Sequence, residues 1–183
     1  MYYELCDFYR RDTSFDFNEE VNGIDWLSLK SGYRIDVGKP LVFNVDRIDD
    51  YINDYDLLPT SNTPLVSERF KILFSDLEDD LQFVKATIAG GNNRLNEDYY
   101  FMNVLNVIPI MDKNRSVYEI KKYGKADVMT IKELYITDLA GHSIVRMAEH
   151  KSYIIVTDDF RKRCMDANLK GINFVPEGDL SFR

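Results

Sequence analysis

The sequence has few of the residues from which disulfide frameworks and metal sites are built, with only two cysteines and two histidines in 183 residues. Cys6 and Cys164 lie far apart and form no CxxC pair, so we expect a reducing compartment and no disulfide framework. Neither His142 nor His150 lies at a metal-ligand spacing from another histidine or a cysteine, which argues against zinc. The sequence therefore predicts no bound metal and no cofactor.

Long hydrophobic runs are also absent. The longest fully apolar runs, at residues 99–102 and 153–156, are four residues long, whereas a helix needs roughly 20 apolar residues to cross a bilayer. The first residues contain no basic region followed by an apolar stretch, so we expect no secretory signal. These features predict a cytoplasmic protein without a membrane partner.

Basic residues are outnumbered by acidic ones, with 23 Lys and Arg against 31 Asp and Glu and a net charge of -8. The asymmetry is concentrated in residues 1–98, which hold 20 acids and 10 bases, while residues 99–183 hold 11 acids and 13 bases. Proteins that bind a phosphate backbone depend on basic patches. We therefore expect no direct nucleic-acid partner.

Common enzyme motifs are missing as well. The sequence contains no GxGxxG, GxxxxGK[ST], GxSxG or HExxH motif and no EF-hand loop. We therefore expect that the chain is not an enzyme. Two alternatives remain open: an enzyme that processes a small polar substrate with His142 and nearby carboxylates, and a general protein-interaction module. A cleft that gathers His142 with two acids would favour the enzyme.

Strand patterns dominate what the sequence does contain. Apolar spacing of the helical kind occurs in two places and predicts two main helices, at about residues 67–79 with Ser67 as N-cap and at about residues 158–169 with Cys164 in the core. We also expect Trp26 in the core. Because strands and helices do not alternate, the fold class should be α+β with a largely antiparallel sheet. Runs rich in Tyr, Phe, Ile and Val predict strands at residues 1–9, 41–45, 81–88, 99–107, 117–123, 143–147 and 153–156.

A polar, proline-flanked stretch at residues 59–64 is the best candidate boundary within the chain, because proline removes a backbone donor and Ser, Thr and Asn favour turns. It divides the sequence into an acidic, β-rich N-terminal lobe at residues 1–60 and an α+β core domain at residues 61–183. We expect the two to pack as one compact unit.

The densest acidic cluster spans residues 46–56 and contains Arg47 as its one basic residue. A charge run of this kind is most often a solvated face, and that alternative stays open. Two tyrosines four residues apart favour a different interpretation, because aromatic rings supply strong contacts while carboxylates steer a basic partner. The sequence thus predicts a protein-binding surface made of Asp46, Asp49, Asp50, Tyr51, Asp54, Tyr55 and Asp56.

Several segments resemble a known family. Residues 64–70 (PLVSERF) and 81–84 (LQFV) look like the P-x-x-S-x-x-F and L/V-Q-F stretches of an immunity protein family, family eleven, from bacterial polymorphic toxin systems. The resemblance covers about residues 61–178 and carries no catalytic residue. Later blocks that resemble the family lie at residues 99–105, 110–112, 144–146, 154–156 and 171–174.

This resemblance implies a cytoplasmic antidote that binds and neutralises a cognate toxin in a stoichiometric protein complex. No turnover is required of such a protein. From the charge alone we expect the toxin domain to be basic and nuclease-like, since an acidic face would attract it.

Overall fold

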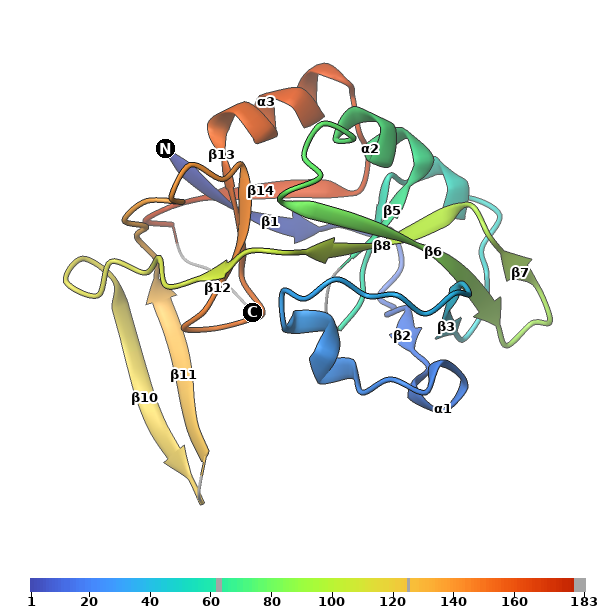
Figure 1. The fold of residues 1–183 in the computed structure, drawn as a ribbon, viewed down its shortest axis with the longest axis horizontal. Helices are drawn as coiled ribbons and strands as arrows, with labels where there is room; N and C mark the ends of the chain where they lie inside the picture. The colour runs from blue at the N-terminus through green and yellow to red at the C-terminus, as the bar shows by residue number, and fades with distance from the viewer. Residues whose placement is uncertain (62–63, 125, 180–183) are drawn as a thin grey trace.

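The computed structural model describes residues 1–61, 64–124 and 126–179, and strands dominate it (Figure 1). Within these ranges 14 strands form three sheets, and about 15% of the residues are helical. The predicted α+β class with two main helices is therefore wrong. Five of the strands are only two or three residues long, too short for an alternating pattern to reveal: β2 (Asp16–Phe17), β4 (Leu57–Leu58), β5 (Leu65–Ser67), β7 (Leu95–Asn96) and β9 (Val107–Ile108).

The first sheet joins the two ends of the chain. Its strand order is β14-β1-β13-β12-β9, with all neighbours antiparallel except β12 and β9. Strand β1 lies between β13 and β14, so the first strand of the chain is held by the last two. The bounds are Tyr2–Asp7 for β1, Ile144–Met147 for β12, Ile154–Thr157 for β13 and Ile172–Pro176 for β14.

The second sheet is built around the long strand β6 (Leu81–Gly90). Its order is β2-β3-β6-β8-β5-β4, and β7 pairs with β6 as well. The first half of β6 pairs antiparallel with β8 (Tyr99–Val104), and the second half pairs parallel with β3 (Leu41–Val45). Strands from either side of residue 60 thus share both sheets, while the division into a lobe and a core domain stays a prediction.

The third sheet is a hairpin of β10 (Val117–Tyr123) and β11 (Ala126–Glu133) that projects from the body (Figure 1). Its base is anchored, because Ile131 is buried and Tyr118 and Met129 pack against the same core cluster. Towards the tip the side chains are exposed, including Ile120 at 56% and Tyr123 at 65%. A two-stranded sheet is only marginally stable by itself in water, so the body must hold this hairpin in place.

The helices are shorter than predicted. The predicted helix at residues 67–79 is α2 (Glu68–Leu73), and the one at 158–169 is α3 (Asp158–Asp166). Ser67 caps α2 as expected, since its hydroxyl accepts from the Phe70 amide. No helix within the described ranges has the length and hydrophobicity needed to span a bilayer. The others are α1 (Glu19–Asn22) and the 3-10 helices η1 (Trp26–Lys30) and η2 (Ile52–Asp54).

Helix α2 stops early because the backbone after it tightens. The amides of Ser75 and Leu77 donate to carbonyls three residues earlier rather than four, and the Ser75 hydroxyl binds the Ile72 carbonyl. A tight turn also returns a side chain to the same face after three residues. Phe74 and Leu77 therefore reach the core without a continuous helix, and the helical spacing of the sequence overestimates its length.

The two longer helices meet over an aromatic stack in the core. The rings of Phe74 and Phe160 are stacked, with centroids 4.0 Å apart and an interplanar angle of 8°, and Phe70 packs against both. Cys164 is buried beside them, where burial raises the pKa of its thiol to about 12. The predicted core position of Cys164 is confirmed, since only 2% of its surface is exposed.

We predict that Phe74→Ala lowers the free energy of unfolding by about 3–5 kcal/mol, because it removes a fully buried ring and leaves a cavity between α2 and α3. Urea denaturation measures the change. Ile72→Ala on the same helix is the control: that side chain is 63% exposed, and the expected change is within about 0.5 kcal/mol. Equal effects of the two substitutions would contradict the described packing.

Candidate protein-binding surfaces

The seven predicted site residues lie between β3 and β4, around η2. The structure brings them together in one region but does not leave them equally accessible. Asp49 and Asp56 are buried, at 8% and 3% exposure, Tyr51 and Tyr55 are half-buried, and Asp46, Asp50 and Asp54 are exposed. The segment is therefore not a uniform acidic face.

Arg11 neutralises the start of this segment. Its guanidinium donates to Asp46 Oδ2 at 2.6 Å and to Asp49 Oδ2 at 3.0 Å, and Arg47 lies 3.3 Å from the other oxygen of Asp49. The hydrogen bonds from Arg11 hold the pKa of the Asp46 carboxyl below its usual range. These contacts tie the loop after β3 to the loop after β1, so the two carboxylates stabilise the chain's own fold.

Asp56 makes the largest set of internal bonds in the segment. Its carboxylate accepts from Ser67 Oγ at 2.6 Å, from Arg69 at 3.1 Å and from the Lys170 amide at 2.9 Å. Its own amide donates to the Lys170 carbonyl, and its carbonyl accepts from the Ser67 amide. Asp56 thus joins the start of β4, the N-terminus of α2 and the turn before β14, and it has a structural role.

The two tyrosines of the segment pack with a third, Tyr9. The Tyr9 ring centroid lies 5.8 Å from that of Tyr51 and 4.7 Å from that of Tyr55. Burial, with the nearby Asp49 carboxylate, raises the pKa of the Tyr9 hydroxyl. The guanidinium of Arg10 stands 5.1 Å from the centre of the Tyr51 ring. Both predicted contact tyrosines are therefore held in place by their own chain.

The accessible part of the predicted site is small. Asp50 has a side chain that is 95% exposed, and its 2.7 Å contact with Arg94 joins two exposed groups, an arrangement that contributes little to stability. Asp54 is exposed, and no lysine or arginine of the described chain forms an ion pair with it. A partner could reach Asp50, Tyr51 and Asp54 without breaking the ion pairs of Arg11 or the hydrogen bonds of Asp56.

His142, the residue of the enzyme alternative, contacts a single buried carboxylate. Its Nδ1 lies 2.7 Å from Asp80 Oδ1, and Asp80 also accepts from the Asn106 side chain at 3.0 Å and from the Ser143 amide at 2.8 Å. Asp80 therefore links three loops. The two acids around His142 that an enzyme site would need are not among its contacts within the described ranges.

The second histidine and the acidic clusters give no metal site in the described part of the chain, where no group of three or more His, Cys, Asp or Glu side chains is placed to hold an ion. The His150 ring packs edge-on against Tyr153, with centroids 4.9 Å apart. It lies in the turn between β12 and β13, where its carbonyl accepts from the Tyr153 amide.

A second accessible region was not predicted. Trp26, expected in the core, is 41% exposed and stands beside Leu27, which is 58% exposed. Both line a groove of about 570 Å³ between η1, the hairpin and a turn of the body. The apolar residues on either side of Trp26 predicted a buried side chain. The one sign of exposure in the sequence was that Trp26 lies in a short segment directly after Asp25. The groove is lined by Trp26, Leu27, Lys30, Asp127, Val128, Met129, Glu149, His150, Lys151 and Ser152.

The surface of the molecule thus carries accessible aromatic and acidic side chains at residues 50–54 and around Trp26. A family model described as Immunity protein family (Imm11) matches residues 15–179, and the chain therefore belongs to this family. Membership indicates a toxin-neutralising immunity function and implies a partner toxin; the family is generally non-enzymatic. No curated protein sequence matches the chain.

We predict that Asp56→Ala lowers the free energy of unfolding by about 2–4 kcal/mol, since it leaves the Ser67 hydroxyl, Arg69 and the Lys170 amide without their acceptor. The matched control is Asp54→Ala two residues away, for which we expect a change within about 0.5 kcal/mol. Chemical denaturation of both variants measures these changes. If Asp56→Ala lowers the free energy of unfolding no more than Asp54→Ala does, the structural role of Asp56 is contradicted.

Proposed function

We propose that the chain neutralises a cognate toxin in the cytoplasm by forming a stoichiometric protein complex, in which it blocks the toxin and transforms no substrate. The match to the immunity family over residues 15–179 is the observation that carries this proposal. The contacts of His142 support it too, because Asp80 and Asn106 engage that ring within a loop junction. No step of the proposed function needs a metal or a cofactor.

The contact surface that we propose first is the accessible part of the predicted site, formed by Asp50, Tyr51 and Asp54. Contacts with Arg11, Tyr9 and Ser67 hold the other four residues of the segment in place: Asp46, Asp49, Tyr55 and Asp56. Two exposed carboxylates around an aromatic ring suit a basic toxin domain, such as a nuclease-like one. Carboxylates at the rim of an interface mainly raise the association rate, while the ring contributes contact area.

Titration of toxin activity separates binding from catalysis. The probe is the protein encoded beside this chain, assayed for growth inhibition and for its own activity. If the complex is stoichiometric, activity should fall linearly with added chain and reach zero at a fixed molar ratio, and the two proteins should co-purify. His142→Ala should leave the end point unchanged. Complete protection by a small fraction of an equivalent, abolished in His142→Ala, would instead establish the enzyme alternative.

Charge reversal tests the proposed contact surface. We expect Asp50→Lys with Asp54→Lys to slow association several-fold at low salt and to flatten its salt dependence, because steering by charge is screened over about 10 Å at 0.1 M salt. Stopped-flow mixing measures both.

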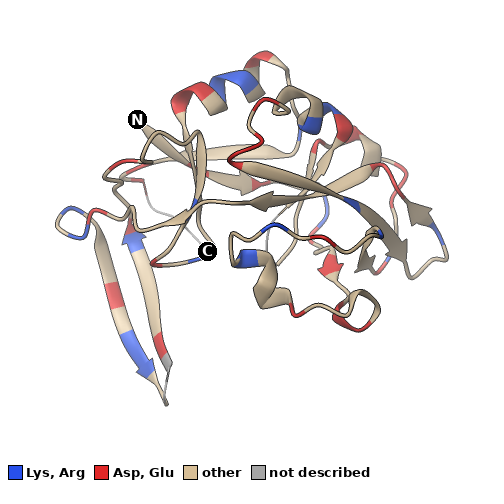
Figure 2. Cartoon of the chain, in the orientation of Figure 1, with Lys and Arg blue, Asp and Glu red and all other residues tan. Residues whose placement is uncertain are grey.

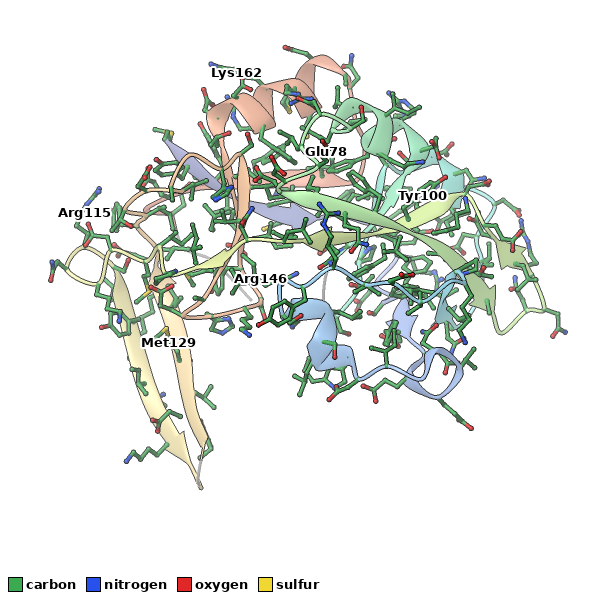
Figure 3. All side chains as sticks on the ribbon, in the orientation of Figure 1. Glu78, Tyr100, Arg115, Met129, Arg146 and Lys162 are labelled. Atoms are coloured by element: carbon green, nitrogen blue, oxygen red, sulfur yellow. The ribbon has the colours of Figure 1, made fainter. Side chains whose placement is uncertain are left out.

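The control for charge reversal carries the same change in net charge elsewhere. Glu78 and Asp166 are exposed acids near the ends of α2 and α3, and Figure 3 labels Glu78 on that side of the molecule. Reversing these two should change the association rate by less than about twofold if steering is local. Equal slowing by both pairs would assign the effect to net charge and remove residues 50–54 from the contact.

A further inference from the structure

The hairpin leaves one strand edge open towards the groove at Trp26. Strands β10 and β11 form a two-stranded sheet, so among the described residues each has one edge without a neighbouring strand. Asp127, Val128 and Met129 all line the groove, although successive side chains of a strand point to opposite faces. Three consecutive residues can share one wall only if the edge of β11 forms that wall. Figure 1 likewise shows β11 on the side of the hairpin that faces η1, and Figure 3 labels Met129 on it.

Both walls of the groove carry exposed apolar side chains. On the wall opposite β11, Trp26 and Leu27 of η1 are 41% and 58% exposed, and on β11 itself Val128 is 44% exposed. Tryptophan is among the residues that most often dominate binding energy at protein interfaces. An open backbone edge facing an exposed tryptophan is the arrangement in which an extended peptide adds a strand and seats a side chain.

Acids outnumber bases around Trp26 and Leu27, although the groove itself is lined by two acids, Asp127 and Glu149, and two lysines, Lys30 and Lys151. Three more acids line an adjoining hollow that shares Trp26 and Leu27 with the groove. Glu19, Asp25 and Glu149 accept hydrogen bonds from backbone amides of the chain. None of the five forms an ion pair with a lysine or arginine that the structure describes. Figure 2 shows acidic residues in red on the loop that carries η1. The five are Glu19, Glu20, Asp25, Asp127 and Glu149.

We infer that this groove binds an extended, basic segment of the toxin, which pairs as an added strand with β11 and packs an apolar side chain against Trp26 and Leu27. The inference rests on the proposed function and names a further contact surface for the same partner. The strand edge supplies backbone hydrogen bonds, the apolar wall supplies contact area, and the acids select lysine and arginine on the incoming segment.

Affinity measurements with matched variants test the groove. The probe is again the toxin domain encoded beside this chain, titrated into the full chain by calorimetry. Leu27→Ala and Val128→Ala should each weaken binding by about fivefold or more, because they remove apolar contact area without changing the charge. Leu95→Ala on β7 is the control: this leucine is 69% exposed outside the groove, and binding should stay within about twofold of the unmodified chain.

Hydrogen exchange on the unmodified complex tests the added strand without any substitution. Within residues 127–132, the alternate backbone amides that point away from β10 should exchange more slowly in the complex, while those of β7 stay unchanged. A complex that leaves the hairpin amides unprotected would overturn the inference. If, without toxin, the β11 amides become more protected as the concentration of the chain rises, the edge pairs with a second copy of the chain. That result would overturn the inference as well.

Charge reversal then identifies the chemistry of the segment. Glu20→Lys with Asp127→Lys should weaken binding and flatten its salt dependence; tighter binding would mean that the groove takes an acidic segment, against the inference. Failure of the groove is distinguishable from failure of the proposed function. If all groove variants still form the stoichiometric complex with unchanged affinity, the groove inference alone is wrong. If no complex forms at all, both the groove inference and the proposed function are wrong.

Discussion

The fold depends on a buried carboxylate. Asp56 receives a serine hydroxyl, an arginine and a backbone amide from segments that lie 11, 13 and 114 residues away. Its main chain binds the same two regions, so that the sheet containing β4 and β5 is fastened to the turn that leads into β14 of the other sheet. A carboxylate so enclosed must be fully hydrogen-bonded, because an unsatisfied buried charge is far more costly than any single bond is favourable. The same bonds fix Ser67 as the cap of α2, and α2 in turn positions Phe70 and Phe74 against α3.

Much of the acidic segment at residues 46–56 is accordingly paired with basic side chains of the same chain. Arg11, Arg47, Arg69 and Arg94 each pair with an acid from residues 46–56. A count of charges along the sequence cannot detect this, since all but one of these arginines lie more than ten residues from the acids they bind. Net charge describes the field far from the molecule, but which carboxylates are available to a partner depends on tertiary pairing.

The sequence predicts strands better than it predicts the class of fold. Residues 41–45, 81–88 and 117–123 are strands because their β-branched and aromatic residues suit a pleated, half-buried surface. The sequence did not predict strand β11 because its residues, ADVMTIKE, place polar side chains on both faces. Such a pattern is expected for a strand that projects from the body. The exposure of Trp26 could not be predicted either, because an apolar neighbourhood in sequence says nothing about whether a third layer covers it.

In the proposed complex the hairpin contributes to recognition, while the body provides stability. Buried aromatic and aliphatic residues secure the two large sheets, whereas the outer part of β10 and β11 buries little and keeps an open edge. Long exposed edges favour aggregation, and proteins commonly protect them with charge. Here Glu119, Lys121 and Lys132 form ion pairs on the hairpin, and the acids near Trp26 repel a second copy of the same groove. In the proposed complex the charge of the edge favours a basic strand and disfavours a second copy of the chain. The same edge can therefore bind a toxin without making the free chain aggregate.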